Sequence, residues 1–180
     1  MLKWFLGTLL GTVLGVAGYF TWYLGAFKPV LIAEKNQGPF HLLYKEHTGA
    51  YHKIAPTIAE VETWAKSKGL DCSRTFGEYF DDPRSVDEGR LHSRGGCLLN
   101  ELPSNLQNEL SLSEYKTSDL PEKKYVTAVF EGSPGIGPMK VYPKVEEYFS
   151  AKGQKPSGAV MEIYVVHSEK AMTTTYLFPL

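Results

Sequence analysis

The sequence predicts an α+β domain made of two β-α-β-β units, preceded by one transmembrane helix. Three observations carry this prediction. The segments "VETWAKSKG" at 61–69 and "VEEYFSAKG" at 145–153 repeat with an offset of 84 residues. Each of these helical segments is followed by strand-like apolar segments, an order typical of a largely antiparallel sheet with both helices on one face. The chain also starts with a long run that contains no charged residue.

The charge-free run covers residues 4–27 and contains 24 residues. A helix of this length reaches about 36 Å, enough for a hydrocarbon core of about 30 Å. Aromatic side chains that favour the headgroup level fall near its ends, namely Trp4, Tyr19, Trp22 and Tyr23. A cleaved signal peptide is the alternative, but the run is longer than a typical signal core and no A-x-A site follows it. We therefore expect residues 1–28 to form a retained single-pass membrane anchor that contacts lipid through residues 4–27.

Small residues recur on one face of this anchor, which predicts a homodimer contact. They are Gly7, Gly11 and Gly15. Glycines spaced by four allow two membrane helices to approach closely, although glycine is also common in membrane helices that do not pair. The flanking charges favour a domain outside the membrane by one positive charge, which does not decide the orientation. These charges are Lys3 with the free amine on one side, and Lys28 and Lys35, offset by Glu34, on the other.

After a predicted linker at 29–37, the domain is expected to span residues 38–180. Its first unit, residues 38–100, contains a strand, a helix and two strands. These segments are 40–49, 54–69, 75–80 and 90–99. In the helix, apolar residues recur at three- and four-residue spacing and Gly69 suits the C-terminal stop. In the last strand, Gly95 and Gly96 indicate a bulge or a bend.

A polar connector at 101–112 leads to the second unit, residues 113–180, which repeats this order. Its strand, helix and two strands are 123–132, 141–153, 158–168 and 172–180. Carrying the offset of 84 into the strands sets Glu78 opposite Glu162. The sequence therefore predicts a carboxylate at the same position of both units. Because both helices are expected on one face, the other face of the sheet is expected to be available as a concave surface.

Glu162 is the residue that most strongly indicates a function. It interrupts the apolar strand "VMEIYVV", where an ionised carboxylate is costly unless it is paired, hydrogen-bonded or kept for a ligand. Alternation places it on the same face as Val160, Tyr164 and Val166. A carboxylate beside an aromatic ring suits a lipophilic cation. The alternative is a structural carboxylate that accepts hydrogen bonds from tyrosines or an arginine.

Other chemistry is not expected. The formal net charge of −1 offers no basic surface for phosphates, so nucleic acid is not an expected partner. The spacing of His41, His47 and His52 matches neither a helix face nor a strand face, so no metal site is predicted. No phosphate loop or nucleophile elbow is present, so no cofactor is expected. Cys72 and Cys97 lack zinc spacing, and two reduced, packed cysteines are favoured over a disulfide.

Several motifs together resemble the GyrI-like superfamily, the small-molecule-binding domains of DNA gyrase inhibitory proteins and multidrug-sensing transcription activators. The motifs are "YKEHTGAYHKI", "WAKSKGL", "GEYFDDP", "LPEKKYVTAVFEGS" and "MEIYVVHSEKAMTTTYLFPL", within residues 38–180. The resemblance implies two units with pseudo-two-fold symmetry and a ligand cleft between them. It also implies that Glu162 reaches into the cleft, with four aromatic residues nearby. These are Tyr164, Trp64, Tyr51 and Tyr79.

The leading hypothesis is a membrane-anchored domain that binds small apolar or cationic ligands. A membrane helix before the domain is similar to the membrane-anchored animal members that act as endoplasmic-reticulum autophagy receptors. Those members carry a long acidic tail that is absent up to Leu180, so their function is not expected here. A membrane-anchored protein-interaction adaptor is the first alternative. A hydrolase of electrophilic small molecules, with Glu162 activating water, is the second. A binding protein is favoured over an enzyme.

Overall fold

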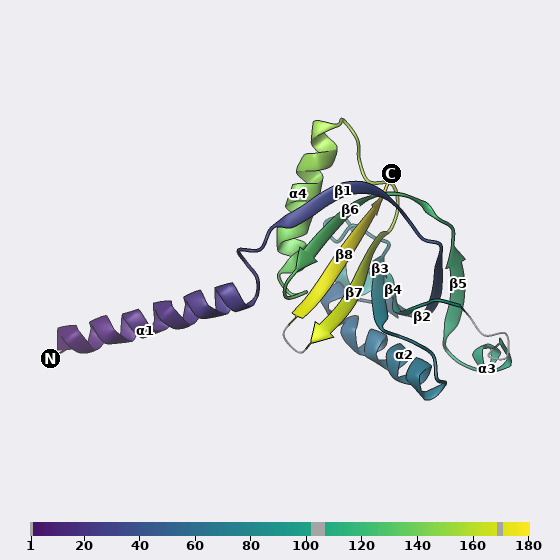
Figure 1. Cartoon of the computed structure of the whole chain (residues 1–180), viewed down its shortest axis with the longest axis horizontal. Coiled ribbons are helices and arrows are strands. Elements are labelled where there is room, and N and C mark those ends of the chain that lie inside the picture. The colour runs from purple at the N-terminus through teal and green to yellow at the C-terminus, as the bar shows by residue number, and fades with distance from the viewer. Residues whose placement is uncertain (1, 102–106, 169–170) are drawn as a thin grey trace.

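The computed structural model describes residues 2–101, 107–168 and 171–180, which form an eight-stranded sheet with helices (Figure 1). The strands are β1 (Val30–Gln37), β2 (Phe40–Thr48), β3 (Arg74–Tyr79), β4 (His92–Leu99), β5 (Lys116–Leu120), β6 (Lys123–Glu131), β7 (Val160–Ser168) and β8 (Ala171–Pro179). The helices are α1 (Leu2–Tyr23), α2 (Ala55–Ser67), α3 (Gln107–Ser111) and α4 (Gly137–Ala151). The α+β class and the antiparallel sheet are confirmed.

The order of the strands shows how the two units join. It is β1-β6-β8-β7-β3-β4-β2-β5, with every described pair antiparallel. The units β2-α2-β3-β4 and β6-α4-β7-β8 meet where β3 pairs with β7. The two remaining strands cross over, because β1 pairs with β6 of the second unit and β5 pairs with β2 of the first. The segment predicted as a linker, 29–37, therefore mostly forms an edge strand. Val30 and Ile32 of this strand pack against the core beneath α4.

Helices α2 and α4 both cover one face of the sheet. Each contributes a buried stripe with helical spacing, which is what fixes the helix on the sheet. The stripe of α2 contains Ile58, Val61 and Ala65, and that of α4 contains Val141, Val145 and Phe149. Helix α4 begins at Gly137, four residues before the predicted start, with Pro138 in its first turn, where a proline loses no helical hydrogen bond.

The opposite face of the sheet is not the open concave surface that was predicted. The sheet curls around that face (Figure 1), and nine buried side chains fill it as one apolar cluster. They are Phe40, Leu42, Tyr44, Phe76, Leu98, Tyr125, Met161, Ile163 and Leu177. Large apolar residues at alternate positions of the central strands supply this second core.

The predicted match between Glu78 and Glu162 is wrong. The offset of 84 holds for the helices, where Val61 and Val145 are both buried. In the strands, however, Glu162 pairs with Gly77, and Glu78 pairs with Met161. The two carboxylates therefore lie on opposite faces, because a shift of one residue reverses the face of every side chain in a strand.

Of the predicted bulge or bend at Gly95 and Gly96, the bulge is excluded, since the pairing of β4 with β2 runs through both residues without a shift. A Cβ atom at Gly95 would lie 2.6 Å from Cγ1 of Ile58 in α2. The glycine at 95 thus allows α2 to approach the sheet closely.

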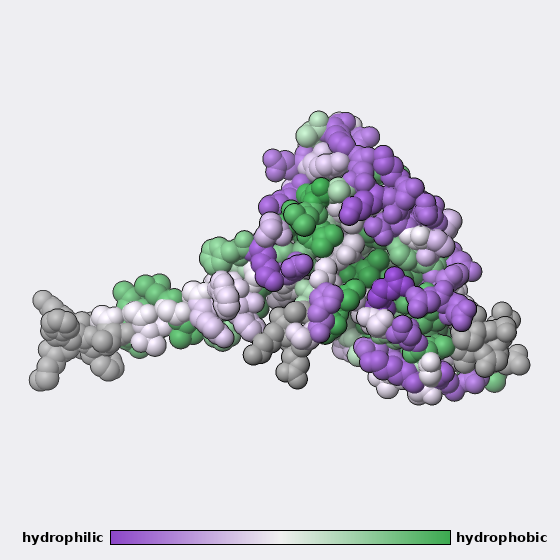
Figure 2. Space-filling view, viewed as in Figure 1, coloured by the Kyte–Doolittle hydropathy of each residue, from purple (hydrophilic) through white to green (hydrophobic). Residues whose placement is uncertain are grey.

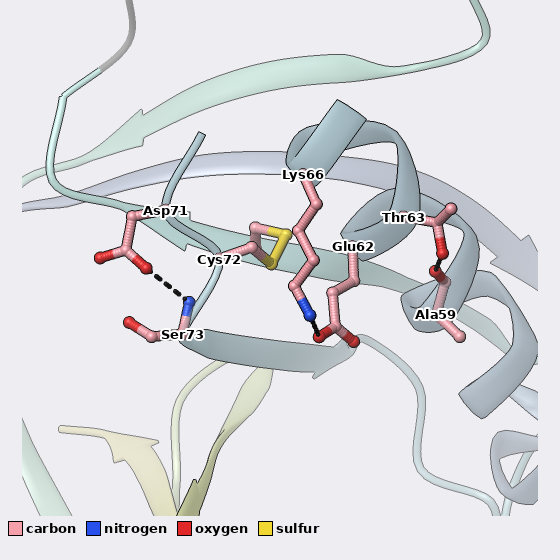
Figure 3. The surroundings of a disulfide bond; sticks show 8 residues. Ala59, Glu62, Thr63, Lys66, Asp71, Cys72 and Ser73 are labelled. Carbon is pink, nitrogen blue, oxygen red and sulfur yellow. Dashed lines mark hydrogen bonds and ion pairs between the residues drawn. A yellow bond between two sulfur atoms is a disulfide. The ribbon is translucent and has the colours of Figure 1, made fainter. Parts of the chain in front are cut away.

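Cys72 and Cys97 form a disulfide, so the prediction of two reduced cysteines is wrong (Figure 3). Cys72 lies between α2 and β3, Cys97 lies in β4, and their Cα atoms are 5.3 Å apart. Beside the bond, the Asp71 carboxylate accepts a hydrogen bond from the Ser73 amide. By closing a loop of 25 residues, the bond stabilises the first unit by about 3 kcal/mol.

Helix α1 extends away from the sheet, and apolar residues lie along its described part (Figures 1 and 2). Large apolar side chains are exposed along it, namely Leu9, Leu10, Val13, Leu14, Val16, Tyr19, Phe20, Trp22 and Tyr23. Within the described residues, no helix combines the length and the apolar character needed to cross a membrane. At Gly7, Gly11 and Gly15 an added Cβ would meet nothing within 4 Å. Dimerisation through these glycines stays a prediction.

Candidate ligand-binding site

Glu162 lies near the centre of the sheet, on the face that the helices cover. Its two neighbours across the strands are Gly77 in β3 and Tyr176 in β8. Tyr176 belongs to the core beneath α4, which fixes the side of the sheet on which Glu162 lies. Only 5% of Glu162 is exposed. The alternation of β7 brings a carboxylate into the interior between the sheet and α4.

The carboxylate of Glu162 is held by tyrosines. The Tyr142 hydroxyl of α4 donates to Oε1 at 3.2 Å, and the Tyr164 hydroxyl of β7 donates to Oε2 at 3.0 Å. The hydroxyl of Tyr79 lies 2.9 Å from that of Tyr164 and shares a hydrogen bond with it. The ring of Tyr51 meets the ring of Tyr79 with centroids 4.8 Å apart. A continuous chain of tyrosines therefore connects the buried acid with the loop that follows β2.

Tyr51 fixes the outer end of this chain through the backbone. Its hydroxyl donates to the carbonyl oxygen of Asp81 at 2.9 Å and accepts from the Asp81 amide at 2.8 Å. At the inner end, Gly77 makes room for Tyr79, because a Cβ atom at 77 would lie 2.7 Å from the Tyr79 hydroxyl. Gly137, the first residue of α4, leaves room for the Tyr176 hydroxyl in the same way. Both glycines allow phenol groups to lie close to the carboxylate.

The electrostatics of this cluster follow from burial. Desolvation raises the pKa of Glu162 to about 7, against the hydrogen bonds from Tyr164 and Tyr142, which lower it. Burial, together with the negative charge of Glu162, also raises the pKa of Tyr79, Tyr142 and Tyr164. In the described part of the chain no basic side chain forms an ion pair with Glu162. The charge of the carboxylate is therefore only partly compensated.

Two fully buried hydroxyl groups, those of Thr174 and Tyr176, lie beside the acid. Neither has a well-aligned hydrogen-bond partner among the described residues, although the Thr174 hydroxyl lies close enough to that of Tyr176 to act on its pKa. On β8, Tyr176 is paired with Glu162 and Thr174 with Tyr164, so both lie next to the cluster. A buried hydroxyl without a partner costs about 1–3 kcal/mol. The site thus carries hydrogen-bonding capacity that its own side chains do not use.

The structure brings together four of the five predicted site residues, namely Glu162, Tyr164, Tyr79 and Tyr51. Trp64 lies elsewhere, on the flank of α2, where it is half-buried against the core around Val61. Its ring centroid is 4.8 Å from that of Tyr115, and the two rings line a shallow groove with other residues of α2. Trp64 therefore has no contact with the Glu162 cluster.

Sequence reasoning missed Tyr142 and Tyr176. Tyr142 stands three residues before Val145, at the border of the buried stripe of α4, and this spacing was the available signal. Tyr176 follows from alternation with Thr174 and Phe178 in β8. Neither pattern shows which tyrosine hydroxyl reaches the carboxylate, because that depends on how α4 lies on the sheet.

The arrangement can bind a cation through the carboxylate and the surrounding rings. It can also act as a proton acceptor near neutral pH, because burial brings the pKa of Glu162 to about 7. Among the described residues, no group of three His, Cys, Asp or Glu side chains is arranged to hold a metal ion.

No protein-family model and no curated protein matches this chain. Several solved structures have the same fold. The EcmrR protein in a complex with DNA is 13% identical, with 98% of this chain and 69% of that chain covered and a TM-score of 0.62. The EcmrR C-terminal domain is 15% identical over 83% of this chain and 96% of its own, with a TM-score of 0.60. A hydrolase from Listeria innocua is 11% identical over 89% and 97%, with a TM-score of 0.52.

At these identities the likeness establishes the fold. The fold is the one that the resemblance to GyrI-like domains implied, with duplicated units and an antiparallel sheet. The DNA in the first structure belongs to EcmrR, so the expected absence of nucleic acid from the partners of this chain stays an expectation. The resemblance to animal autophagy receptors also stays a prediction.

Proposed function

We propose that this domain binds a small lipophilic cation at Glu162. One observation carries the proposal: a carboxylate that is 5% exposed is held only by neutral tyrosine hydroxyls. Ionisation of such a group is costly, and a cation seated against it would offset that cost. The resemblance to GyrI-like domains and the fold shared with the EcmrR C-terminal domain support the same function.

The surroundings suit an apolar cation better than a small hydrated one. The rings of Tyr79, Tyr142 and Tyr164 would present their faces or hydroxyls to the guest. A cation over an aromatic face gains about 0.5–2 kcal/mol when it is desolvated. The unpartnered hydroxyls of Thr174 and Tyr176 would accept a polar group of the ligand.

Entry of a ligand requires the cover to move. Tyr142 reaches the carboxylate from α4, while Tyr164 reaches it from the same strand. Tyr142 is the part of the cover that can swing away without disturbing the sheet. We therefore assign the closed state to Tyr142 on Glu162, and the binding-competent state to a displaced Tyr142.

Calorimetric titration of the full chain with tetraphenylphosphonium, a lipophilic cation, tests the proposal. Glu162→Gln is expected to weaken binding by about 1.5–3 kcal/mol, roughly ten- to hundred-fold, because a charge-assisted contact is lost. Glu147→Gln, which removes an exposed carboxylate from α4, is the matched control and should bind like the wild type. Trp64→Phe should also leave the affinity unchanged.

Equal affinities of wild type and Glu162→Gln would reject the role of the carboxylate. If neither lipophilic cations nor neutral apolar compounds bind saturably, the protein-interaction adaptor would be favoured instead. The groove beside Trp64 and Tyr115 would then be its candidate surface.

A second candidate function is hydrolysis of an electrophilic small molecule. The observation that favours it is the raised pKa of Glu162, about 7, which suits a general base that activates water. A hydrolase from Listeria innocua has the same fold. Turnover of an epoxide by the purified chain, lost in Glu162→Gln, would support this function over simple binding.

We also propose that the domain is held at a membrane through residues 4–27, as a single-pass protein. Support comes from the absence of charge in this segment and from the exposed apolar side chains of the described part of α1. Flotation of the full chain with phosphatidylcholine vesicles, resistant to alkaline carbonate, is the expected result. A chain that stays in the soluble fraction would reject the anchor.

A further inference from the structure

Lys140 of α4 holds the chain at the point where α1 ends. Its ammonium group donates to the carbonyl oxygens of Gly25 at 3.3 Å, Ala26 at 2.5 Å and Lys28 at 2.5 Å. These carbonyls follow the last turn of α1. One side chain thus uses all three of its N–H groups to fix the exit of α1 on α4.

Close backbone contacts strengthen this joint, which we call the α1–α4 joint and which comprises residues 24–28, 131–133 and Lys140. The Leu24 carbonyl accepts a hydrogen bond from the Ser133 amide at 3.0 Å. Gly25 has φ +83, and an added Cβ would lie 3.2 Å from the carbonyl oxygen of Glu131. The Lys140 ammonium also lies 5.0 Å from the ring centroid of Phe130. These contacts join the end of α1 to the connection between β6 and α4 and, through the Lys140 side chain, to α4 itself.

The same end of α4 covers the proposed ligand site. Gly137 lies against the Tyr176 hydroxyl. Tyr142, two residues beyond Lys140, donates to Glu162. The first part of α4, residues 137–142, therefore contains both Lys140, which binds the chain after α1, and Tyr142, which covers Glu162.

Pro143 separates this first part from the rest of α4. Proline has no N–H, so the carbonyl of Met139 lacks its usual helical partner, and a helix bends most readily at such a point. Beyond Pro143 the helix is held by buried Val145 and Phe149 and by the ion pair of Lys152 with Glu34 of β1. In the first part Val141 is buried as well, so a movement there is a small tilt at Pro143 with Val141 still in the core.

We propose that α1 controls access to the Glu162 site: displacement of α1 pulls on Lys140, tilts the first part of α4 at Pro143 and lifts Tyr142 from the carboxylate. The ligand half of this proposal rests on the proposed function. Because coupling between two sites is reciprocal, a ligand that displaces Tyr142 also loosens the hold on α1. A membrane or a partner that positions α1 would then set the affinity of the domain.

Lys140→Met in the full chain tests this coupling, because it removes the ammonium group and keeps the apolar stem. Hydrogen exchange measured without ligand is expected to rise together in residues 24–28 and 137–142. Affinity for tetraphenylphosphonium is expected to rise about three- to ten-fold, because less free energy is needed to open the cover. Lys144→Met, an exposed lysine one turn further along α4, should change neither quantity. Lys140→Arg should retain most of the wild-type behaviour.

Gly25→Ala perturbs the same joint from the side of α1, because φ +83 and the neighbouring backbone disfavour a side chain there. Gly25→Ala is the second variant, for use if Lys140→Met does not fold. Hydrogen exchange should again rise together in residues 24–28 and 137–142. Exchange that rises only in residues 24–28 would overturn the proposal, as would paired loosening without a change in measurable affinity. If neither wild type nor variants bind the cation but both segments loosen together, the coupling stands and the proposed ligand fails.

Discussion

Glu78 and Glu162 are two buried carboxylates on paired strands, and their surroundings differ completely. Glu78 faces the second core, where Nε of Arg94 donates to its Oε2 at 2.5 Å. The Arg94 guanidinium in turn lies 4.5 Å from the ring centroid of Tyr44. Glu162 faces α4 and has tyrosine hydroxyls as its partners. One acid is paired with a dedicated cation, whereas the other has neutral hydroxyl donors as its partners.

This difference separates a structural acid from a candidate site residue. A buried ion pair with good geometry is complete, so neither of its members gains from a third group. A buried carboxylate with neutral donors is incomplete, and incomplete groups are typical of sites that bind or react. Burial alone does not distinguish them, since Glu78 is 8% and Glu162 is 5% exposed. The charge of the hydrogen-bond partner distinguishes the two acids.

The largest expected effect follows from breaking the complete pair. Glu78→Gln leaves Arg94 charged, 13% exposed at its side chain and without a carboxylate. We expect a loss of about 3–5 kcal/mol in the free energy of unfolding, because an unpaired buried charge remains. Urea unfolding at pH 7 measures it. A loss below 1 kcal/mol would show that Arg94 finds solvent and that the pair is not structural.

A smaller effect is expected when the pH is varied. The folded-state pKa of Glu162 is about 7, above the ordinary value of 4.5, so the folded protein holds this proton more tightly than the unfolded chain. The resulting stability is fully present below pH 4.5 and is lost as pH rises to about 7. A shift of this size corresponds to about 3 kcal/mol.

Urea unfolding of wild type and Glu162→Gln between pH 4.5 and 8 tests this linkage. The free energy of unfolding of the wild type should fall relative to that of the variant across this range. Parallel pH profiles would mean that Glu162 titrates normally and that its burial has been compensated by a group other than the tyrosines.

The strands and helices that carry Glu78 and Glu162 could be predicted from the sequence, but the contacts between these elements could not. Alternation placed Glu162 and Tyr164 on one face of a strand, and helical spacing placed the stripes of α2 and α4. The carry-over of one offset from helix to strand failed, because the face of Glu78 depends on a single residue in the preceding connection. Trp64 was grouped with the site because the resemblance to GyrI-like domains implied it, yet its ring packs against Tyr115 and the core beneath α2.

Long-range pairing explains the other differences. The crossing of β1 to β6 and of β5 to β2 joins segments far apart in the chain, and local patterns do not carry this information. Tyr142 was missed for the same reason, because its hydroxyl reaches Glu162 only once α4 has packed on the sheet. The disulfide likewise depends on the distance between a loop and β4, not on the spacing of the cysteines.

The smallest effect concerns the neutral donors themselves. Tyr142→Phe removes one hydrogen bond that lowers the pKa of Glu162, so the pKa should rise above about 7. A bond of this kind contributes about 0.5–1.5 kcal/mol, which corresponds to a shift of up to about one pH unit. The infrared carboxylate band of Glu162, assigned by comparison with Glu162→Gln, reports this titration. Tyr51→Phe is the matched control, because Tyr51 bonds to the Asp81 backbone rather than to the acid. An unchanged midpoint in Tyr142→Phe would show that Tyr164 alone holds the carboxylate, and the cover on α4 would then be steric rather than electrostatic.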